Sequence, residues 1–144
     1  KKKKHEKTRN MRDYSKAKIY KLINDDLPDK VYYGSTIQKY LCNRLTTHKR
    51  DSKKETMTSS ELFKTGKVKI ILVENYPCNS KEELYKRERF YIENNECINK
   101  VIPTRTRKEH YQDNKEEIIK KCKEWREKNK EKYKKYMADR YLKK

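Results

Sequence analysis

Side chains that suit phosphodiester hydrolysis recur in the first two thirds of the sequence. Two predicted strands carry Tyr20 and Tyr32, a following helix carries Arg44 and His48, and a later helix carries Glu88. Residues four apart lie on one face of a helix, so Arg44 and His48 are expected side by side. A carboxylate can hold a divalent metal, an arginine can neutralise charge on a pentavalent phosphate, and a tyrosine or histidine can orient or deprotonate water. By spacing alone the set is a weak indication, because Arg, His and Glu on basic helices are usually only solvated.

The strands that would position these side chains follow from hydrophobic periodicity. Residues 18–23 alternate polar and apolar, which predicts a strand, and residues 24–29 are dense in turn formers. Residues 31–34 are β-branched and aromatic, so they predict a second strand that completes a hairpin. Residues 68–73 are largely apolar and predict a third strand, which we expect to be central in the sheet.

Helices fill the intervals between the strands. Apolar residues and a histidine recur at i, i+4 and i+7 from Leu41, which predicts a helix that begins near Gln38. Ser80 followed by Glu83 has the spacing of a capping box and predicts the start of a second helix. A short turn is expected at residues 60–63. The predicted class is therefore α/β, a small three-stranded antiparallel sheet flanked by helices.

The order of these motifs resembles that of the GIY-YIG nuclease superfamily over residues 18–100. The matching fragments are Lys18-Ile19-Tyr20, Tyr32-Tyr33-Gly34-Ser35-Thr36, Arg44-Leu45 with His48, Glu88 with Tyr91-Ile92, and Asn99. The chain departs from the pattern at Lys18, where the family has Gly, and at Tyr33, where it has Ile. The arrangement is also similar to short GIY-YIG proteins of large DNA viruses, which often carry Lys/Asn/Tyr-rich C-terminal repeats.

The resemblance implies a GIY-YIG-type endonuclease that hydrolyses DNA phosphodiester bonds with a divalent metal, Mg²⁺ or Mn²⁺. Glu88 would be the single protein ligand of that metal. One carboxylate suffices because Mg²⁺ keeps several waters and takes further ligands from substrate phosphate. The implied partner is duplex or branched DNA, with no small-molecule cofactor and no membrane.

The resemblance also implies roles for the remaining motif residues. Tyr20 and Tyr32 would face the active site, where one of them orients or deprotonates the attacking water, and both assignments stay open. Arg44 would bind the scissile phosphate, and His48 is similar to a histidine that follows the arginine in many members. Asn99 would be a structural brace between the sheet and the segment after the last helix.

The charge of the chain favours a nucleic-acid partner. The 144 residues include 41 Lys or Arg and 22 Asp or Glu, a net charge of +19. Residues 1–17 and 103–144 have net charges of +6 and +8, whereas the longer segment 18–102 has +5 and most of the aliphatic residues. We therefore predict a basic N-terminal arm at 1–17, a nuclease domain at 18–102 and a basic helical repeat arm at 103–144.

The C-terminal segment contains a repeat of 15 residues, in which residues 108–122 align with residues 123–137. Its composition favours helix, and it has no Gly or Pro beyond Pro103. Two interpretations remain open, a solvated and partly disordered tail or a helical arm along a phosphate backbone. The candidate nucleic-acid-binding residues are Lys49, Arg87, Arg107, Lys120, Lys121 and Arg126.

Three classes of function remain to be compared. The first is the metal-dependent endonuclease, the second is a catalytically silent nucleic-acid-binding module with the same fold, and the third is a membrane-surface or scaffold protein. No helix pairs a clear apolar stripe with a basic face, which disfavours the third class. No apolar run long enough to span a bilayer and no signal peptide is visible, and the four cysteines have no CxxC spacing. We expect an intracellular protein, cytoplasmic or nuclear and not secreted.

Overall fold

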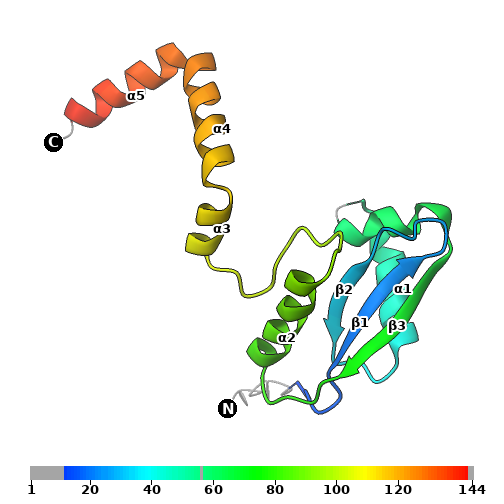
Figure 1. Cartoon of the computed structure of the whole chain (residues 1–144). Coiled ribbons are helices and arrows are strands. Elements are labelled where there is room, and N and C mark those ends of the chain that lie inside the picture. Colours follow the sequence, from blue (N-terminus) through cyan, green and yellow to red (C-terminus); the bar gives the residue numbers. More distant parts are fainter. Residues whose placement is uncertain (1–11, 56, 143–144) are drawn as a thin grey trace, which may run out of the picture. The chain divides into compact units, whose positions relative to one another are not determined.

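Three antiparallel strands form the centre of the first part of the chain (Figure 1). β1 (Lys18–Asn24) pairs with β2 (Tyr32–Thr36) on one side and with β3 (Val68–Asn75) on the other. The computed structural model describes residues 12–55 and 57–142, so most of the predicted N-terminal arm lies outside the described residues. The predicted small antiparallel sheet flanked by helices is confirmed.

The order of the strands corrects one expectation. The sequence favours β3 as the central strand, but the order is β2-β1-β3, so β1 is central and β3 lies at an edge. Ile19, Tyr20 and Leu22 of β1 are completely buried, whereas Ile71 and Leu72 of β3 are 38% and 42% exposed. A continuous apolar run is typical of a strand covered on both faces. β3 is instead an edge strand that carries apolar side chains on both faces, and only some of these side chains are covered.

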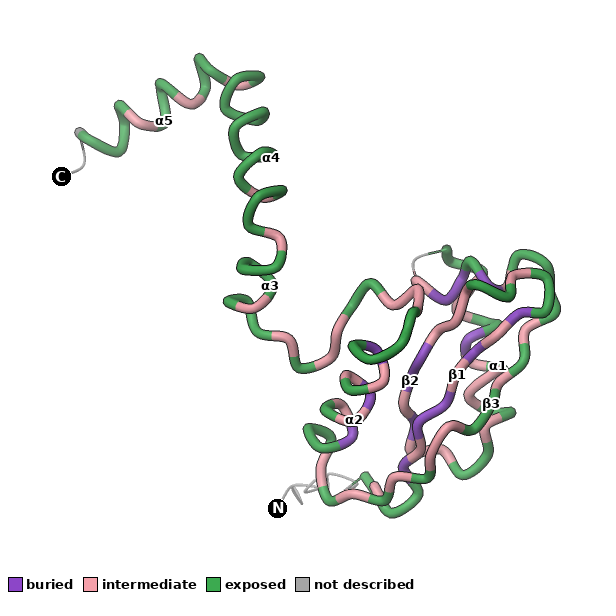
Figure 2. Tube along the Cα trace, viewed as in Figure 1, coloured by how far each residue is buried: buried purple, intermediate pink, exposed green. Residues whose placement is uncertain are grey.

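Helices cover both faces of the sheet because successive side chains of a strand point to opposite faces. On one face Ile19 packs with Ala17 and with Leu84 of α2 (Lys81–Asn94). On the other face Tyr20 and Leu22 pack with η1 (Thr58–Thr65) and with α1 (Leu41–Ser52). Figure 2 shows the resulting buried segments along β1, β2 and α2. Ala17, which the charge pattern assigns to the N-terminal arm, is therefore part of the core.

The helix boundaries differ locally from the predicted ones. α1 begins at Leu41 rather than near Gln38, and its N-cap residue makes no side-chain capping bond. At α2 the Ser80 hydroxyl accepts from the Glu83 amide, as predicted, at 3.2 Å. The Glu83 carboxylate accepts from the backbone amide of Asn79 rather than from that of Ser80, so only half of the capping box forms. The short turn predicted at 60–63 is a 3₁₀ helix of eight residues, η1.

The chain divides into two units, a first unit (Lys1–Thr104) and an arm (Arg105–Lys144). The arm consists of α3 (Arg107–Asp113), α4 (Lys115–Lys128) and α5 (Lys130–Leu142), so its described residues are helical. Asn114 and Asn129, which occupy equivalent places in the 15-residue repeat, separate the three helices. Each donates its side-chain amide to the carbonyl four residues earlier, at 2.9 Å.

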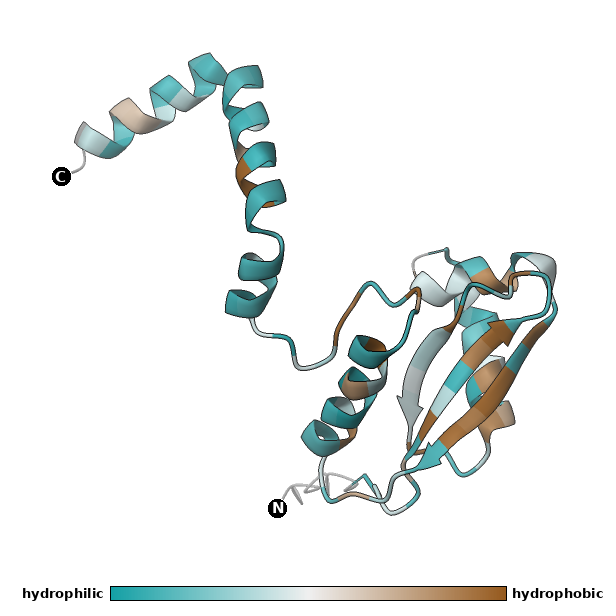
Figure 3. Ribbon diagram, viewed as in Figure 1, coloured by the Kyte–Doolittle hydropathy of each residue, from teal (hydrophilic) through white to brown (hydrophobic). Residues whose placement is uncertain are grey.

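Polar residues dominate the surface of the arm (Figure 3). α3 and α4, which the structure describes in full, contain no buried residue. Nor does any described helix of the chain have the length and apolar character needed to cross a membrane.

Candidate active site

A hydrogen-bonded chain centred on the phenol of Tyr20 links β1, α1 and η1. The Tyr20 oxygen accepts from Arg44 Nε at 2.8 Å and lies 2.7 Å from His48 Nε2. On the other side of the imidazole, His48 Nδ1 lies 3.1 Å from Ser59 Oγ. Arg44 can only donate, so we assign the single phenolic proton of Tyr20 to His48 Nε2. The imidazole then carries its own proton on Nδ1 and donates it to Ser59.

Burial keeps this chain uncharged except at the guanidinium. The pKa of His48 is lowered to about 4, first by burial and then by the nearby charge of Arg44. The pKa of Tyr20 is raised, mainly by burial, although Arg44 acts in the opposite direction. At neutral pH both rings are therefore neutral, which is the state that the assigned hydrogen bonds require.

Gly34 is needed for the position of the Tyr20 ring. The two residues are partners in the β1–β2 pairing, and a Cβ atom at position 34 would lie 2.5 Å from the Tyr20 oxygen and 2.7 Å from its Cζ. No larger residue fits without displacing the phenol. Gly34 of the second motif thus leaves the space that the ring of Tyr20, in the first motif, occupies.

The carboxylate of Glu88 lies at the outer edge of β2, where elements from both faces of the sheet meet. It is 9% exposed, and Oε2 accepts from the Ser35 hydroxyl at 2.5 Å. Burial raises the pKa of Glu88, while the Ser35 hydrogen bond and the charge of Arg44 act to lower it. A hollow of about 270 Å³ opens beside it, lined by Tyr32, Arg44 and Glu88 among others. We call this space the Glu88 hollow.

The two motif tyrosines occupy different environments. Tyr20 is fully buried and is not part of the lining of the Glu88 hollow, whereas Tyr32 is partly exposed and lines it. The ring of Tyr32 meets His48 edge-on, with 5.6 Å between centroids. Burial, followed by the charge of Glu88, raises the pKa of Tyr32. Of the two phenols, Tyr32 is the one within reach of a substrate in the hollow.

Asn99 joins the segment after α2 to the strand β2. Its side-chain oxygen accepts from the backbone amide of Tyr33 at 2.9 Å, and its side-chain nitrogen donates to the Tyr33 carbonyl at 2.8 Å. Tyr33, the departure from the family pattern, stacks on Tyr91 of α2 with 5.8 Å between centroids. The larger ring is thus accommodated in the interface between sheet and helix.

The candidate nucleic-acid-binding residues are in contrasting positions. Lys49 is exposed on α1. Arg87 forms two hydrogen bonds with Glu74, of 2.7 and 3.1 Å, and its guanidinium lies over the rings of Tyr76, Phe90 and Tyr91. These contacts occupy Arg87 away from the Glu88 hollow, so in this conformation it is not presented to a phosphate.

The remaining candidates are exposed residues of the arm. Lys121 pairs with Glu117 at 2.6 Å, and the Arg126 guanidinium lies 5.4 Å from the centroid of the Tyr133 ring. Arg107 lies at the start of α3, and Lys120 lies on α4.

The residues at the hollow fit one hard divalent cation held through a single carboxylate. Within residues 12–55 and 57–142 no three His, Cys, Asp or Glu residues cluster as a metal site. Soft or zinc-like coordination is therefore not built in, and Glu88 is the carboxylate that faces the hollow. Mg²⁺ retains several waters and binds substrate phosphate, so one buried carboxylate suits it.

Three further residues of the site escaped the sequence-based prediction of roles. Ser35 lies inside the second matching fragment, beside Gly34, and that position is the one indication available from the sequence. Ser59 lies in η1, a separate element, and nothing in its sequence surroundings indicates a contact with His48. The steric role of Gly34 depends on strand register, which the sequence does not specify.

Comparison with known families agrees with this geometry. The model of the GIY-YIG catalytic domain matches residues 16–102, more than half of the chain. No curated protein and no solved structure gives a significant match. The matched range contains the whole hydrogen-bonded chain at Tyr20 and every lining residue of the Glu88 hollow except Pro103. The chain therefore belongs to the GIY-YIG catalytic-domain family, a family of endonucleases.

Proposed function

We propose that this protein is a metal-dependent endonuclease that hydrolyses phosphodiester bonds of DNA. The observation that supports the proposal most strongly is the Glu88 hollow, where a buried carboxylate, an arginine and a phenol surround one space. These are the groups that phosphodiester hydrolysis requires for metal binding, charge neutralisation and orientation of water. The family match supports the same class of reaction.

Glu88 would hold Mg²⁺ or Mn²⁺ through its carboxylate. When bound there, the cation would neutralise charge on the phosphate and lower the pKa of water and of a nearby phenol. The hydrogen bond from Ser35 fixes Oε2 of Glu88, so the carboxylate is oriented before any ligand binds.

Arg44 would bind the scissile phosphate from the opposite wall of the hollow. Its Nε is held by the Tyr20 phenol, so the two terminal nitrogens of the guanidinium are the donors left to face the substrate. Tyr20 and His48 would act as positioning residues, because both are buried and fix the orientation of Arg44.

Tyr32 would orient the attacking water. The water oxygen forms a bond to phosphorus and releases one proton to solvent. The P–O bond to the leaving sugar oxygen breaks, and that oxygen takes up one proton from solvent. Tyr32 is suited to this role because it lines the hollow, whereas the Tyr20 oxygen is already shared between Arg44 and His48. The choice between the two tyrosines thus rests on exposure.

The arm would add affinity for DNA rather than chemistry. Residues 103–144 have a net charge of +8 but none of the motif residues. Exposed Lys and Arg bind phosphates and release counterions, so they strengthen binding to all sequences alike.

The repeat also supports kinship with the short viral GIY-YIG proteins. An intracellular location belongs to the same proposal, and the four cysteines are free.

Incubation of supercoiled plasmid with the purified protein tests the proposal. We expect nicked or linear DNA with Mg²⁺ or Mn²⁺ and intact plasmid with EDTA. A catalytically silent binding module, the rival function, would retard the plasmid in both conditions and leave it supercoiled. That outcome would overturn the proposed activity.

A further inference from the structure

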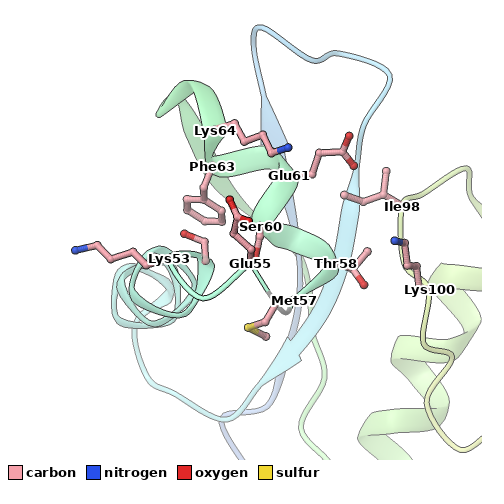
Figure 4. A pocket seen from close by; sticks show the side chains of 11 residues that line it. Lys53, Glu55, Met57, Thr58, Ser60, Glu61, Phe63, Lys64, Ile98 and Lys100 are labelled. Carbon is pink, nitrogen blue, oxygen red and sulfur yellow. The ribbon is translucent and has the colours of Figure 1, made fainter.

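A second hollow in the first unit is not part of the candidate active site. Its volume is about 740 Å³, and it lies beside η1, bounded by Phe63, Lys53, Lys64 and Lys100 among others (Figure 4). This volume falls within the range of about 300–1,000 Å³ that is usual for small-molecule sites. We call it the lysine pocket.

A third hollow, of about 290 Å³, lies beside both the lysine pocket and the Glu88 hollow. It shares Tyr32 and Val101 with the Glu88 hollow and shares Met57, Thr58 and Lys100 with the lysine pocket. The three hollows are therefore neighbours on the first unit, so a strand bound at Glu88 lies close to the pocket.

The walls of the lysine pocket combine positive charge with an aromatic ring. Lys53, Lys64 and Lys100 are exposed, and none of them forms an ion pair within the described part of the chain. Phe63 stacks against His48, with 6.4 Å between centroids, and also lines the pocket. Two carboxylates, Glu55 and Glu61, also line the pocket. Glu61 pairs with Lys30, and the charges of Lys64 and Lys100 also help to lower its pKa.

We propose that the lysine pocket binds a single unpaired nucleotide of the substrate strand. A phosphate would contact the lysines, and a base would lie against Phe63. A concave pocket admits one extruded base but excludes a stacked duplex, and extrusion requires the least energy where the base is already unpaired. This inference rests on the proposed function, and it assigns branched or bulged DNA as the preferred substrate.

Binding measured without divalent cations tests the pocket separately from catalysis. The probes are two fluorescein-labelled duplexes of one sequence, one fully paired and one with a single unpaired adenine. We expect the full-length protein to bind the second on the order of tenfold more tightly, as one base stacked on an aromatic ring provides. Equal affinities for the two duplexes would overturn the inference.

A matched pair of double variants separates the pocket from general charge. Lys64→Ala with Lys100→Ala should bring the affinity ratio of the two duplexes close to one. Lys39→Ala with Lys86→Ala removes the same charge from exposed positions outside all three hollows and should preserve the ratio. If both double variants change the ratio equally, the pocket is not the cause.

Free dAMP at the same concentration as the bulged duplex should not displace it, because the strand adds phosphate contacts that the free nucleotide lacks. Displacement at equal concentration would assign the pocket to free nucleotides and overturn the strand proposal. If the protein cleaves DNA but binds the two duplexes with equal affinity, only the pocket proposal is refuted. If it prefers the bulged duplex but does not cleave DNA, only the proposed activity is refuted.

Discussion

In the first unit the charged groups of the site are buried or partly buried and hydrogen-bonded, whereas the charged groups of the arm are exposed. Glu88 is 9% exposed and bonded to Ser35, and Arg44 is fixed by the Tyr20 phenol. Lys120, Lys121 and their neighbours in α4 are exposed, and that helix contains no buried residue. Groups that are held by burial and hydrogen bonds keep a fixed orientation, which catalysis requires. Exposed cations bind phosphates of any sequence, so they add affinity without specificity.

Among the substitutions of Arg44, Tyr32 and Tyr20, that of Arg44 by Ala should lower kcat the most. Arg44→Ala removes the proposed phosphate contact, so kcat should fall about 10²–10³-fold. Arg44→Lys keeps the charge but loses the planar fork, and a loss of about tenfold is expected. Plasmid-nicking rates measure both, with Arg50→Ala, an exposed residue of the same helix, as the control. Wild-type rates in both Arg44 variants would assign the phosphate to another residue.

Substitution of the two tyrosines should separate contact with water from positioning. Tyr32→Phe should lower kcat on the order of tenfold to a hundredfold while Tm stays close to wild type. Tyr20→Phe leaves Arg44 and His48 without their shared partner inside the core, so Tm should fall together with kcat. The reverse pattern, with Tm lowered only at Tyr32, would contradict the assignment.

The buried imidazole should make the stability of the first unit depend on pH. The pKa of His48 is lowered to about 4, whereas a histidine in the unfolded chain titrates near 6.5. The unfolded chain therefore binds the proton first as the pH falls, and the free energy of unfolding decreases between pH 6.5 and pH 4. This contribution amounts to about 2 kcal/mol between pH 7 and pH 5.

Urea unfolding of wild type and His48→Gln at the two pH values measures that contribution. The variant has no imidazole at this position, so its free energy of unfolding should lack this dependence on pH. The difference in free energy of unfolding between wild type and variant should therefore shrink as the pH falls. A difference that does not change with pH would show that the imidazole is accessible to protons in the native state.

Deletion of the arm should have the smallest effect on catalysis. Without residues 104–144, cleavage at saturating concentration should continue, but the slope of affinity against salt should become shallower by about 0.9 for each phosphate that the arm neutralises. Deletion of residues 123–144 alone should give an intermediate slope, because one copy of the repeat remains. Identical slopes for the three proteins, measured on one labelled duplex, would show that the arm does not bind DNA.

The same contrast explains how much the sequence could predict. Strand alternation and β-branched residues locate β1 and β2, and Ser80 locates the start of α2, because these are properties of neighbouring residues. The order of the strands could not be predicted, since the apolar run of β3 fits an edge as well as a centre. Ser59 reaches His48 from a separate element, so no local pattern could indicate that they meet.

The family motifs indicate more of the site than local patterns do. Tyr20 is distant in sequence from Arg44 and His48, and the structure brings all three into one hydrogen-bonded chain. Their order in the sequence identifies the family, but not which tyrosine faces the substrate. That distinction depends on burial, which the paired position of Gly34 and the packing of α1 determine.

The central claim is that Glu88 binds the catalytic metal while binding to DNA depends on other residues. Plasmid cleavage and duplex affinity of Glu88→Gln, measured in Mg²⁺ beside Glu82→Gln, test it most directly, because Glu82 is an exposed carboxylate on the same helix. We predict that Glu88→Gln binds DNA like wild type and does not cleave it, whereas Glu82→Gln does both. Cleavage by Glu88→Gln at the wild-type rate would contradict the account.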